Sequence, residues 1–212
     1  MTESSLDLLV LHGVRLLGFA DTDRITARFA LDRTATGEAL EDARAHGWVD
    51  RSSFGEAAGW SLTARGRAEN ERGLAAELDA SGGRDVVHQT YLEFLDLNGR
   101  LLRAVTDWQT RPVPGDPLAA NDHQDLRWDR RTLATLGDLG TQLRPLTANL
   151  AGVLDRLDGY HARFTHALSE VERGQRSWVD ALEVDSCHTV WFQLHEDLLA
   201  TLGVQRGSEP IA

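Results

Sequence analysis

LDRTATGEALEDARAHGWVDRSSFGEAAGWSLT, residues 31–63, is the stretch of sequence that decides the fold. Leu31 ends one apolar helical segment. Thr34 or Thr36 is placed to cap the next helix, because a hydroxyl at the N-cap accepts a backbone N–H that has no helical partner. Gly47 is expected to end that helix, since glycine is favoured just past a helix C-terminus. The first half of the stretch therefore predicts a helix, a turn and a second helix.

The second half of the stretch predicts a two-stranded ribbon. Residues 48–50 and 60–62 alternate apolar and polar side chains, as half-buried strands do. Residues 51–59 lie between them and hold two glycines and two serines, a composition typical of a hairpin tip.

Helices are also predicted on both sides of this stretch. Residues 6–17, LDLLVLHGVRLL, repeat apolar side chains at spacings of three, four and seven, which indicates a strongly apolar helix. Asp21 or Thr22 is placed to cap a short helix that follows. Residues 63–79 predict a longer helix, with arginine and glutamate four residues apart at its surface.

Three short motifs resemble the winged helix-turn-helix regulators of the MarR and PadR kind. They are LDRT at 31–34, RAHGWVDR at 44–51, similar to an R-x-x-G-L-V-x-R exit into the wing, and LTARGR at 62–67, similar to an L-T-x-x-G-R exit from it. The resemblance covers about residues 6–80, and the whole chain also resembles actinobacterial proteins labelled transcriptional regulators. It implies a DNA-binding regulator that acts as a homodimer on operator DNA.

The resemblance also implies where DNA would be contacted, because the second helix of the motif enters the major groove. Residues 34–46 hold three acids and one arginine. Glu38 could accept a hydrogen bond from cytosine N4; alternatively the acids form a solvated helix face, favoured early by the helix dipole. The implied DNA-binding residues are Arg33, Thr34, Thr36, Glu38, Arg51, Ser52, Ser53 and Arg65. The alternative function is a module of winged-helix shape that binds a ligand or a protein and not DNA.

Composition limits the class of protein. The chain has 212 residues, 42% of them hydrophobic, so it can form one large domain or two small ones with a core. The net charge of −11 gives no bulk electrostatic argument for nucleic acid. One cysteine excludes an internal disulfide framework. Residues 1–7 lack the positive start of a signal peptide and no apolar run approaches the ~20 residues of a membrane span, so a cytoplasmic protein without membrane contact is expected.

A second, helical domain is expected after the small residues at 80–83. The predicted domains are 1–80, the winged helix, and 84–206, a helical bundle for effector binding or dimerisation. Its predicted helices cover 85–110, 124–139, 142–157, 159–173, 177–182 and 185–202. The predicted fold is therefore mainly α, with one small β-ribbon in the N-terminal domain.

The helical domain concentrates histidine and tryptophan, and three interpretations stay open. The residues form a packed aromatic core, or line a pocket for a small-molecule effector, or bind a metal through Asp158 with His161 or Asp185 with His188. A pocket with aromatic walls and a few polar groups is the usual ligand site. The candidate ligand-binding residues are Trp108, Asn121, His123, Cys187, His188, Trp191 and His195. The absence of H-E-x-x-H and of paired cysteines leads us to expect no metal and no cofactor.

Catalysis is not expected. Cys187 and His188 are adjacent on one predicted helix, so their side chains point about 100° apart and cannot form a nucleophile–base pair. A buried free cysteine usually packs as a small hydrophobic residue. The sequence has no Walker loop, dinucleotide fingerprint or G-x-S-x-G elbow, which predicts a protein that is not an enzyme.

Overall fold

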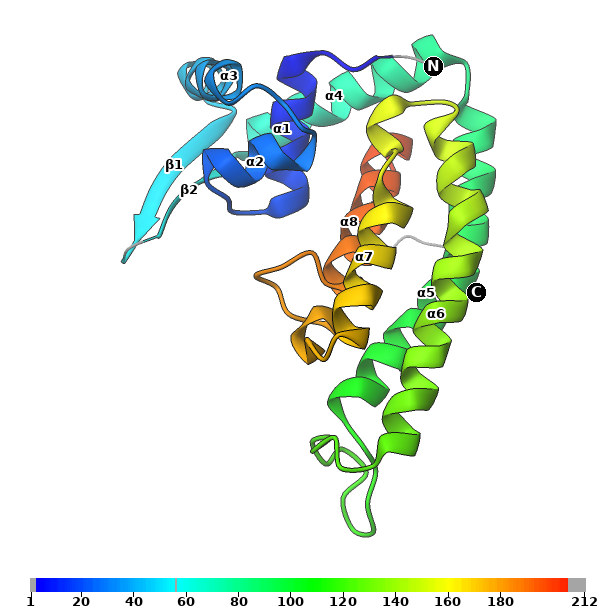
Figure 1. Cartoon of the computed structure of the whole chain (residues 1–212). Helices are drawn as coiled ribbons and strands as arrows, with labels where there is room; N and C mark the ends of the chain where they lie inside the picture. Colours follow the sequence, from blue (N-terminus) through cyan, green and yellow to red (C-terminus); the bar gives the residue numbers. More distant parts are fainter. Residues whose placement is uncertain (1–2, 56, 206–212) are drawn as a thin grey trace. The chain divides into compact units, whose positions relative to one another are not determined.

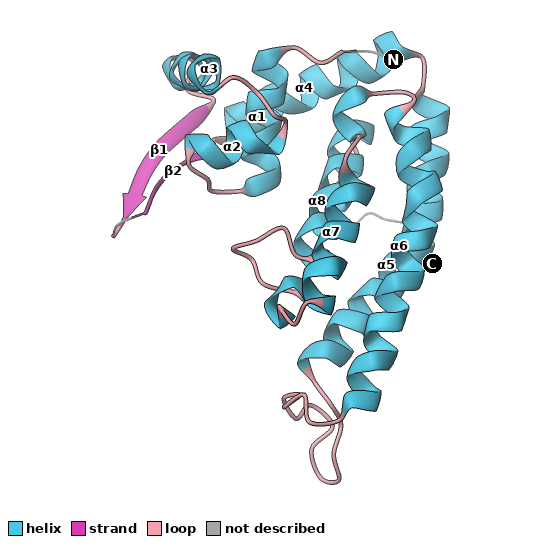
Figure 2. Ribbon diagram, in the orientation of Figure 1, coloured by secondary structure: helices cyan, strands magenta, loops and turns pink. Residues whose placement is uncertain are grey.

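The computed structural model describes residues 3–55 and 57–205 and is mainly helical. Helix accounts for 69% of the structure, and the described residues form eight α-helices and one two-stranded antiparallel sheet. Figure 2 shows how little of the chain is strand. The mainly α class predicted from the sequence is confirmed.

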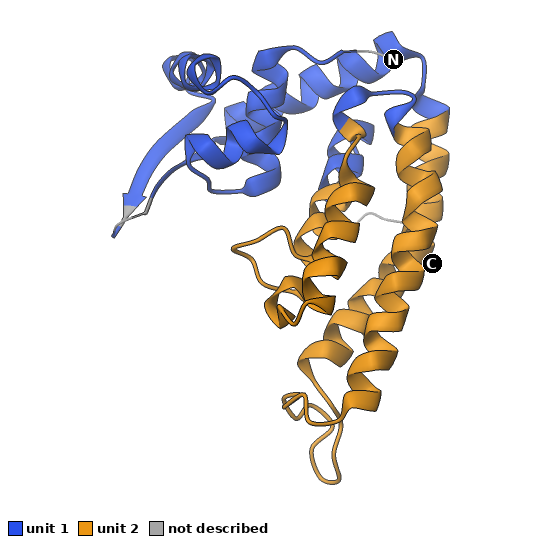
Figure 3. Ribbon diagram, viewed as in Figure 1, with its two compact units in different colours: residues 1–85, 151–156, 196–209 blue, residues 86–150, 157–195, 210–212 orange. Residues whose placement is uncertain are grey.

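The chain divides into two compact units, coloured separately in Figure 3. Among the described residues, unit 1 contains 3–85, 151–156 and 196–205, and unit 2 contains 86–150 and 157–195. The sequence predicts domains of 1–80 and 84–206. Those domain boundaries remain a prediction. The compact units differ from the predicted domains because two late segments, 151–156 and 196–205, belong to unit 1.

Unit 1 begins with three short helices, α1 (Leu6–Leu17), α2 (Thr22–Arg28) and α3 (Arg33–Ala45). The strands β1 (Val49–Phe54) and β2 (Ala57–Leu62) form an antiparallel hairpin in which Val49 pairs with Leu62, and α4 (Ala64–Ser81) follows. Figure 1 shows α1, α2 and α3 grouped beside the hairpin. The three helices pack on one another, and α1 also packs on β2 and α4.

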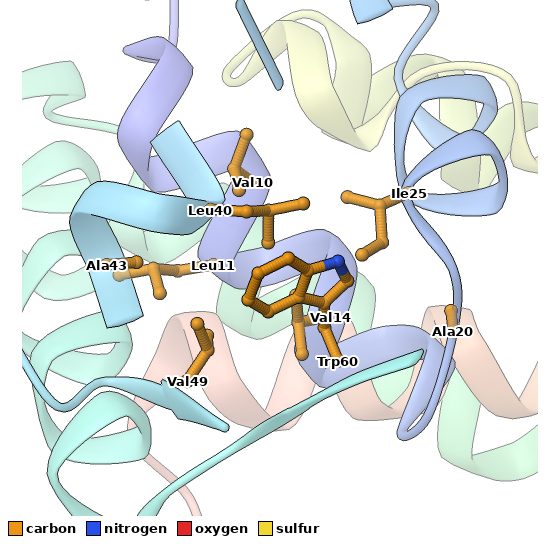
Figure 4. Packing of buried hydrophobic residues seen from close by; sticks show 9 residues of the cluster. All are labelled: Val10, Leu11, Val14, Ala20, Ile25, Leu40, Ala43, Val49 and Trp60. Atoms are coloured by element: carbon orange, nitrogen blue, oxygen red, sulfur yellow. The ribbon is translucent and has the colours of Figure 1, made fainter. Parts of the chain in front are cut away.

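A core cluster of unit 1 takes residues from the first three helices and from both strands (Figure 4). Trp60 of β2 is its largest residue, and its backbone exchanges two hydrogen bonds with Ala20, between α1 and α2. The Trp60 indole also donates to the Thr22 hydroxyl at 3.2 Å. The hairpin is therefore anchored to the helices. The buried residues of this cluster are Val10, Leu11, Val14, Ala20, Ile25, Leu40, Ala43, Val49 and Trp60.

The helix ends in unit 1 confirm one predicted cap and correct another. Asp21 caps α2 by accepting the N–H of Arg24 at 2.8 Å, as expected. The cap of α3 is Asp32 and not Thr34 or Thr36, because its carboxylate accepts the N–H of Ala35 at 2.8 Å and the helix starts at Arg33. An ionised carboxylate also interacts favourably with the helix dipole at this end.

Unit 2 contains most of the long helices. They are α5 (Arg84–Gln109), α6 (Leu126–Ala151), α7 (Tyr160–Glu172) and α8 (Cys187–Leu202), joined in part by short 3-10 turns at Asp155–Leu157 and Arg176–Val179. The first two residues of α5, the last residue of α6, and α8 from Glu196 onward belong to unit 1. None of the described helices is long and apolar enough to cross a membrane.

Two helix predictions in this half of the chain are wrong. The predicted helices 124–139 and 142–157 are one helix, α6, which continues through Gly140 and Pro145. Gly140 is buried, and a Cβ there would lie 3.4 Å from the ring of Phe164, so this glycine allows a close helix contact and does not break the helix. The predicted helix 177–182 is the 3-10 turn Arg176–Val179.

Candidate functional site

The outer face of α3 presents the residues for which DNA contact was implied. Leu40 and Ala43 turn inward to the core, so the opposite side of the helix, with Arg33, Thr34 and Glu38, is exposed. Thr36 is fully buried, and its hydroxyl donates to the Asp32 carbonyl at 2.7 Å. Thr36 therefore has to be removed from the candidate set, because its side chain belongs to the interior.

Carboxylates already accompany the arginines around α3. Arg33 donates to Asp23 of α2. Arg44 pairs with Glu41 at 2.8 Å, and Arg51 of the hairpin lies 4.0 Å from the other oxygen of Glu41. The arginines of this surface do not form an unopposed positive patch.

The hairpin brings its own polar residues next to α3. Arg51 and Ser53 are exposed and Ser52 is half-buried. Arg51 faces Trp60 across the ladder, and its guanidinium lies 5.4 Å from the indole ring, a cation–π distance. This contact holds the Arg51 side chain against the hairpin and leaves the charge at the surface.

The L-T-x-x-G-R motif has a local explanation at the start of α4. Thr63 accepts the N–H of Gly66 at 3.0 Å and donates to the Gly47 carbonyl at 2.7 Å. A Cβ on Gly66 would lie 1.8 Å from the carbonyl oxygen of Trp48, so only glycine fits here. The motif fastens the end of α3 to the start of α4 and leaves Arg65 exposed beside Gly47.

Three of the candidate ligand-binding residues form one cluster at the end of α5. The rings of Trp108 and His123 lie 4.5 Å apart. Asn121 donates to the Trp108 carbonyl and to Asp129, both at 3.0 Å, and His123 Nδ1 lies 3.1 Å from Asp129. These hydrogen bonds tie the connection between α5 and α6 to both helices.

The candidates on α8 form a different cluster. The Trp191 ring stacks on the Phe94 ring at 4.9 Å, and its indole donates to the Asn98 side chain at 3.1 Å. The ring of His195 lies 5.5 Å from the same Phe94 ring. The middle of α8 is therefore packed against α5 through aromatic rings.

Cys187 and His188 at the start of α8 differ in exposure. Cys187 is fully buried, and burial raises the pKa of its thiol to about 12, so a thiolate does not form near neutral pH. His188 is half-buried, and its ring lies 6.5 Å from the ring of Phe192, one turn later on the same helix. The thiol therefore packs as a hydrophobic group, in agreement with the sequence-based interpretation.

The two clusters are separate. Asn98 and Trp108 are ten residues apart on α5, a rise of ~15 Å along the helix. The structure therefore does not bring these residues together into one pocket, which was one of the three interpretations left open by the sequence.

The two aspartates considered as metal ligands, Asp158 and Asp185, form hydrogen bonds within the protein. Asp185 forms two hydrogen bonds with the guanidinium of Arg163, at 2.7 and 2.9 Å. Asp158 accepts the backbone N–H of Gly159 at 2.6 Å, directly before α7. In the described part of the chain no three or more His, Cys, Asp or Glu side chains are grouped to hold a metal ion.

A buried ion cluster in unit 1 was missed at the sequence level. Arg156 donates to Glu77 at 2.7 Å, to Thr201 at 2.8 Å and to Asp197. His12 Nε2 lies 3.0 Å from Asp197. All five side chains are at least nine-tenths buried, and they come from four distant parts of the chain.

The electrostatics of this cluster favour a neutral His12 next to ionised acids. Burial lowers the pKa of His12. Burial would by contrast raise the pKa of the Asp197 carboxyl, but hydrogen-bonding His12 and the Arg156 guanidinium outweigh it and hold that pKa well below its usual range. Neutral His12 then donates from Nε2 to Asp197.

Asn70 fits this protonation state when its side-chain amide is turned over. Its Oδ1 lies 3.4 Å from His12 Nδ1, and its Nδ2 has no partner among the described residues. The two ends of an amide have nearly the same shape. Turning the amide by half a revolution lets Nδ2 donate to Nδ1, so both nitrogens gain a partner.

The chain was also compared with known proteins. No protein-family model, characterised protein or solved structure matches it. Function is therefore inferred from the residues and their geometry.

Proposed function

We propose that residues 6–81 form a winged helix that binds double-stranded operator DNA, and that the protein is a homodimeric transcriptional regulator. The observation that carries this proposal is the order α1, α2, short turn, α3, hairpin, α4, with the first turns of α3 exposed. In a helix-turn-helix the second helix enters the major groove and its first turns contact the bases.

The polar groups at this surface support the proposal. Arg33, Thr34 and Glu38 occupy the exposed start of α3, where base edges would be met. Arg51 and Ser53 of the hairpin are placed to contact phosphates. The ion pairs of Arg33 with Asp23 and of Arg51 with Glu41 are exposed, and such pairs contribute little to stability. Exchanging these carboxylates for phosphates therefore costs little.

The alternative function is a protein-interaction module of the same shape. It is favoured by Glu38, Glu41 and Asp42, which make the exposed side of α3 acidic. The partner of such a face would be a basic protein surface, because DNA phosphates are repelled by it.

DNA binding is tested by fluorescence polarisation with the full chain and a labelled DNA fragment from upstream of its own gene, between about 50 and 200 mM salt. We expect the logarithm of the binding constant to fall linearly with the logarithm of salt concentration, because phosphate contacts release counterions. Arg51→Ala should weaken binding and reduce the salt slope by about one.

Arg84→Ala is the matched control. Arg84 is also an exposed arginine in an ion pair, with Asp79, but it follows α4, which extends ~27 Å from the hairpin end. Its removal should leave binding unchanged. No binding at the lowest salt, or equal effects of the two substitutions, would contradict DNA binding and favour the protein-interaction function.

Unit 2 is proposed to sense a small-molecule effector. Its helices α5 to α8 form a bundle around their own buried residues, and a bundle can hold a ligand between its helices. The homodimer is tested separately by analytical ultracentrifugation of the full chain over a range of concentrations.

A further inference from the structure

Unit 2 contains a hollow between α5 and α6. Its lining includes none of the candidate ligand-binding residues discussed above. Its volume is 320 Å³. The two helices run side by side in Figure 1. Trp128 at the start of α6 donates to the Asp107 carbonyl near the end of α5, and Arg100 donates to Gln142 at 3.1 Å, so the helices are antiparallel.

Small side chains at the helix contact create the hollow. Ala104 of α5 and Thr132 of α6 line it and are 3% and 4% exposed, so they form its floor. The Thr132 hydroxyl is turned to the backbone carbonyl of Trp128, at 3.3 Å. Among the described lining residues there is no large apolar side chain to fill the space above them.

The walls carry three arginines against one acid. Arg100 and Arg103 come from α5 and Arg131 from α6, and Asp107 is the one carboxylate among the described lining residues. In the part of the chain that the structure describes, none of the three arginines takes part in an ion pair, although the chain has 33 acids for its 22 basic residues. The Arg131 guanidinium rests on the Trp128 ring at 4.5 Å, which orients it without neutralising it.

Three arginines that line one hollow with a single carboxylate, and that form no ion pair among the described residues, favour an anion. Each guanidinium offers a fork of N–H donors that fits a carboxylate or a phosphate with two parallel hydrogen bonds. A concave site lined by one sign of charge also concentrates ligands of the opposite sign. The volume lies at the small end of the range for small-molecule pockets, ~300–1,000 Å³.

We propose that this hollow binds a small ligand with two or more negative charges, carried by phosphate or carboxylate groups. Asp107 adds a hydrogen-bond acceptor, which favours a ligand that also bears a hydroxyl or amino group. The chemical class of the effector, which this assigns, rests on the proposed function of unit 2. Anion binding itself is independent of DNA.

The test is isothermal titration calorimetry on the full chain at low ionic strength with two probes, inorganic pyrophosphate and citrate. Binding of either probe is expected, and their relative affinities distinguish a phosphate site from a carboxylate site. Arg103→Gln with Arg131→Gln should weaken binding at least tenfold. Arg127→Gln with Arg130→Gln removes the same charge from exposed positions outside the lining and should leave binding unchanged.

Asp107→Asn is a second variant, and it should bind both probes more tightly because it removes a charge that repels them. Misfolding cannot explain a gain in binding. Equal losses in the two double variants, or no binding of either probe, would overturn the proposal. If the chain binds either anion but not DNA, the anion site is supported and the proposed function as a transcriptional regulator is contradicted. If the chain binds DNA but neither anion, the regulator is supported and the anion site is contradicted.

Discussion

At the scale of single residues, His12 is the most informative side chain of unit 1. It is fully buried, Asp197, Arg156 and Asn70 face it, and Arg28 also acts on it electrostatically. Burial lowers its pKa, so the folded protein holds it neutral. In the unfolded chain a histidine takes up a proton near pH ~6.5.

This difference predicts a pH-dependent stability. Below about pH 6.5 the unfolded state binds a proton that folded His12 does not, so the free energy of unfolding falls as the pH falls. The slope from His12 is at most about 1.4 kcal/mol per pH unit. Asp197, whose pKa is also lowered, contributes a fall of the same sign below about pH 4.

The measurement is urea unfolding of His12→Gln and of the unsubstituted chain between about pH 5 and 8, the range in which a histidine titrates. Glutamine retains a donor for Asp197 but does not titrate, so the variant should lose stability less steeply on acidification. His88→Gln removes an exposed histidine and serves as control. Identical pH profiles for His12→Gln and the unsubstituted chain would show that His12 does not titrate differently on folding.

At the scale of elements, the junction of α3, the hairpin and α4 depends on Gly66. Its missing Cβ allows the Trp48 carbonyl to lie against the first turn of α4. The same turn is capped by Thr63, whose hydroxyl also reaches Gly47. Residues 63–66 therefore determine the direction in which α4 starts after the hairpin.

We predict that Gly66→Ala destabilises the protein by at least about 1–3 kcal/mol, because a methyl group at this position overlaps backbone atoms that must shift. Gly137→Ala is the matched control on α6. Gly137 is exposed and nothing lies within 4 Å of an added Cβ, so alanine there should stabilise the helix by up to about 1 kcal/mol. Urea unfolding midpoints measure both effects; equal midpoints for the two variants would refute the packing argument.

Element boundaries were predictable where the signal is local. Apolar spacing identified α1 and α5, the arginine and glutamate residues four apart indicated α4, and alternation identified the two strands. The prediction of a helix break near Gly140 was wrong, because the role of a glycine depends on which residues pack against it. Gly140 lies against Phe164 of a later helix, and close packing there favours a continuous helix.

At the scale of the whole molecule, unit 1 is completed by segments from the far end of the chain. Arg156 and Asp197 neutralise one another and bind Glu77 and His12. Removing one side of a buried ion pair leaves an uncompensated charge, which costs more than the pair itself contributes.

We therefore predict that a fragment of residues 1–85 is much less stable than the full chain. It retains His12 and Glu77 without Arg156 and Asp197. Circular dichroism melting should show a lower transition temperature or no cooperative transition. Adding Glu77→Leu and His12→Leu to the fragment should raise its transition, since apolar residues do not need ionic partners. A fragment that melts like the full chain would show that the buried cluster is dispensable.

The candidate site was predictable only in part. The motifs placed Arg33, Thr34, Glu38 and Arg51 at the surface of a helix and a hairpin, and these residues are exposed there. The ion-pair partners of Arg33 and Arg51 could not be identified from the sequence. Asp23, the partner of Arg33, belongs to another helix. Glu41 comes close to Arg51 only when the hairpin packs beside α3.

Local chemistry was enough to identify most elements of unit 1: periodicity gives helices and strands, Asp21 and Gly47 give helix ends, and Thr63 and Gly66 give one junction. Folding in three dimensions settled which charges meet. Arg156, Glu77, Asp197 and His12 lie far apart in the sequence, and nothing local indicates that they face one another. Burial makes isolated charges so costly that they must find partners, and the partners are chosen by the packing of segments that are at least 41 residues apart in the sequence.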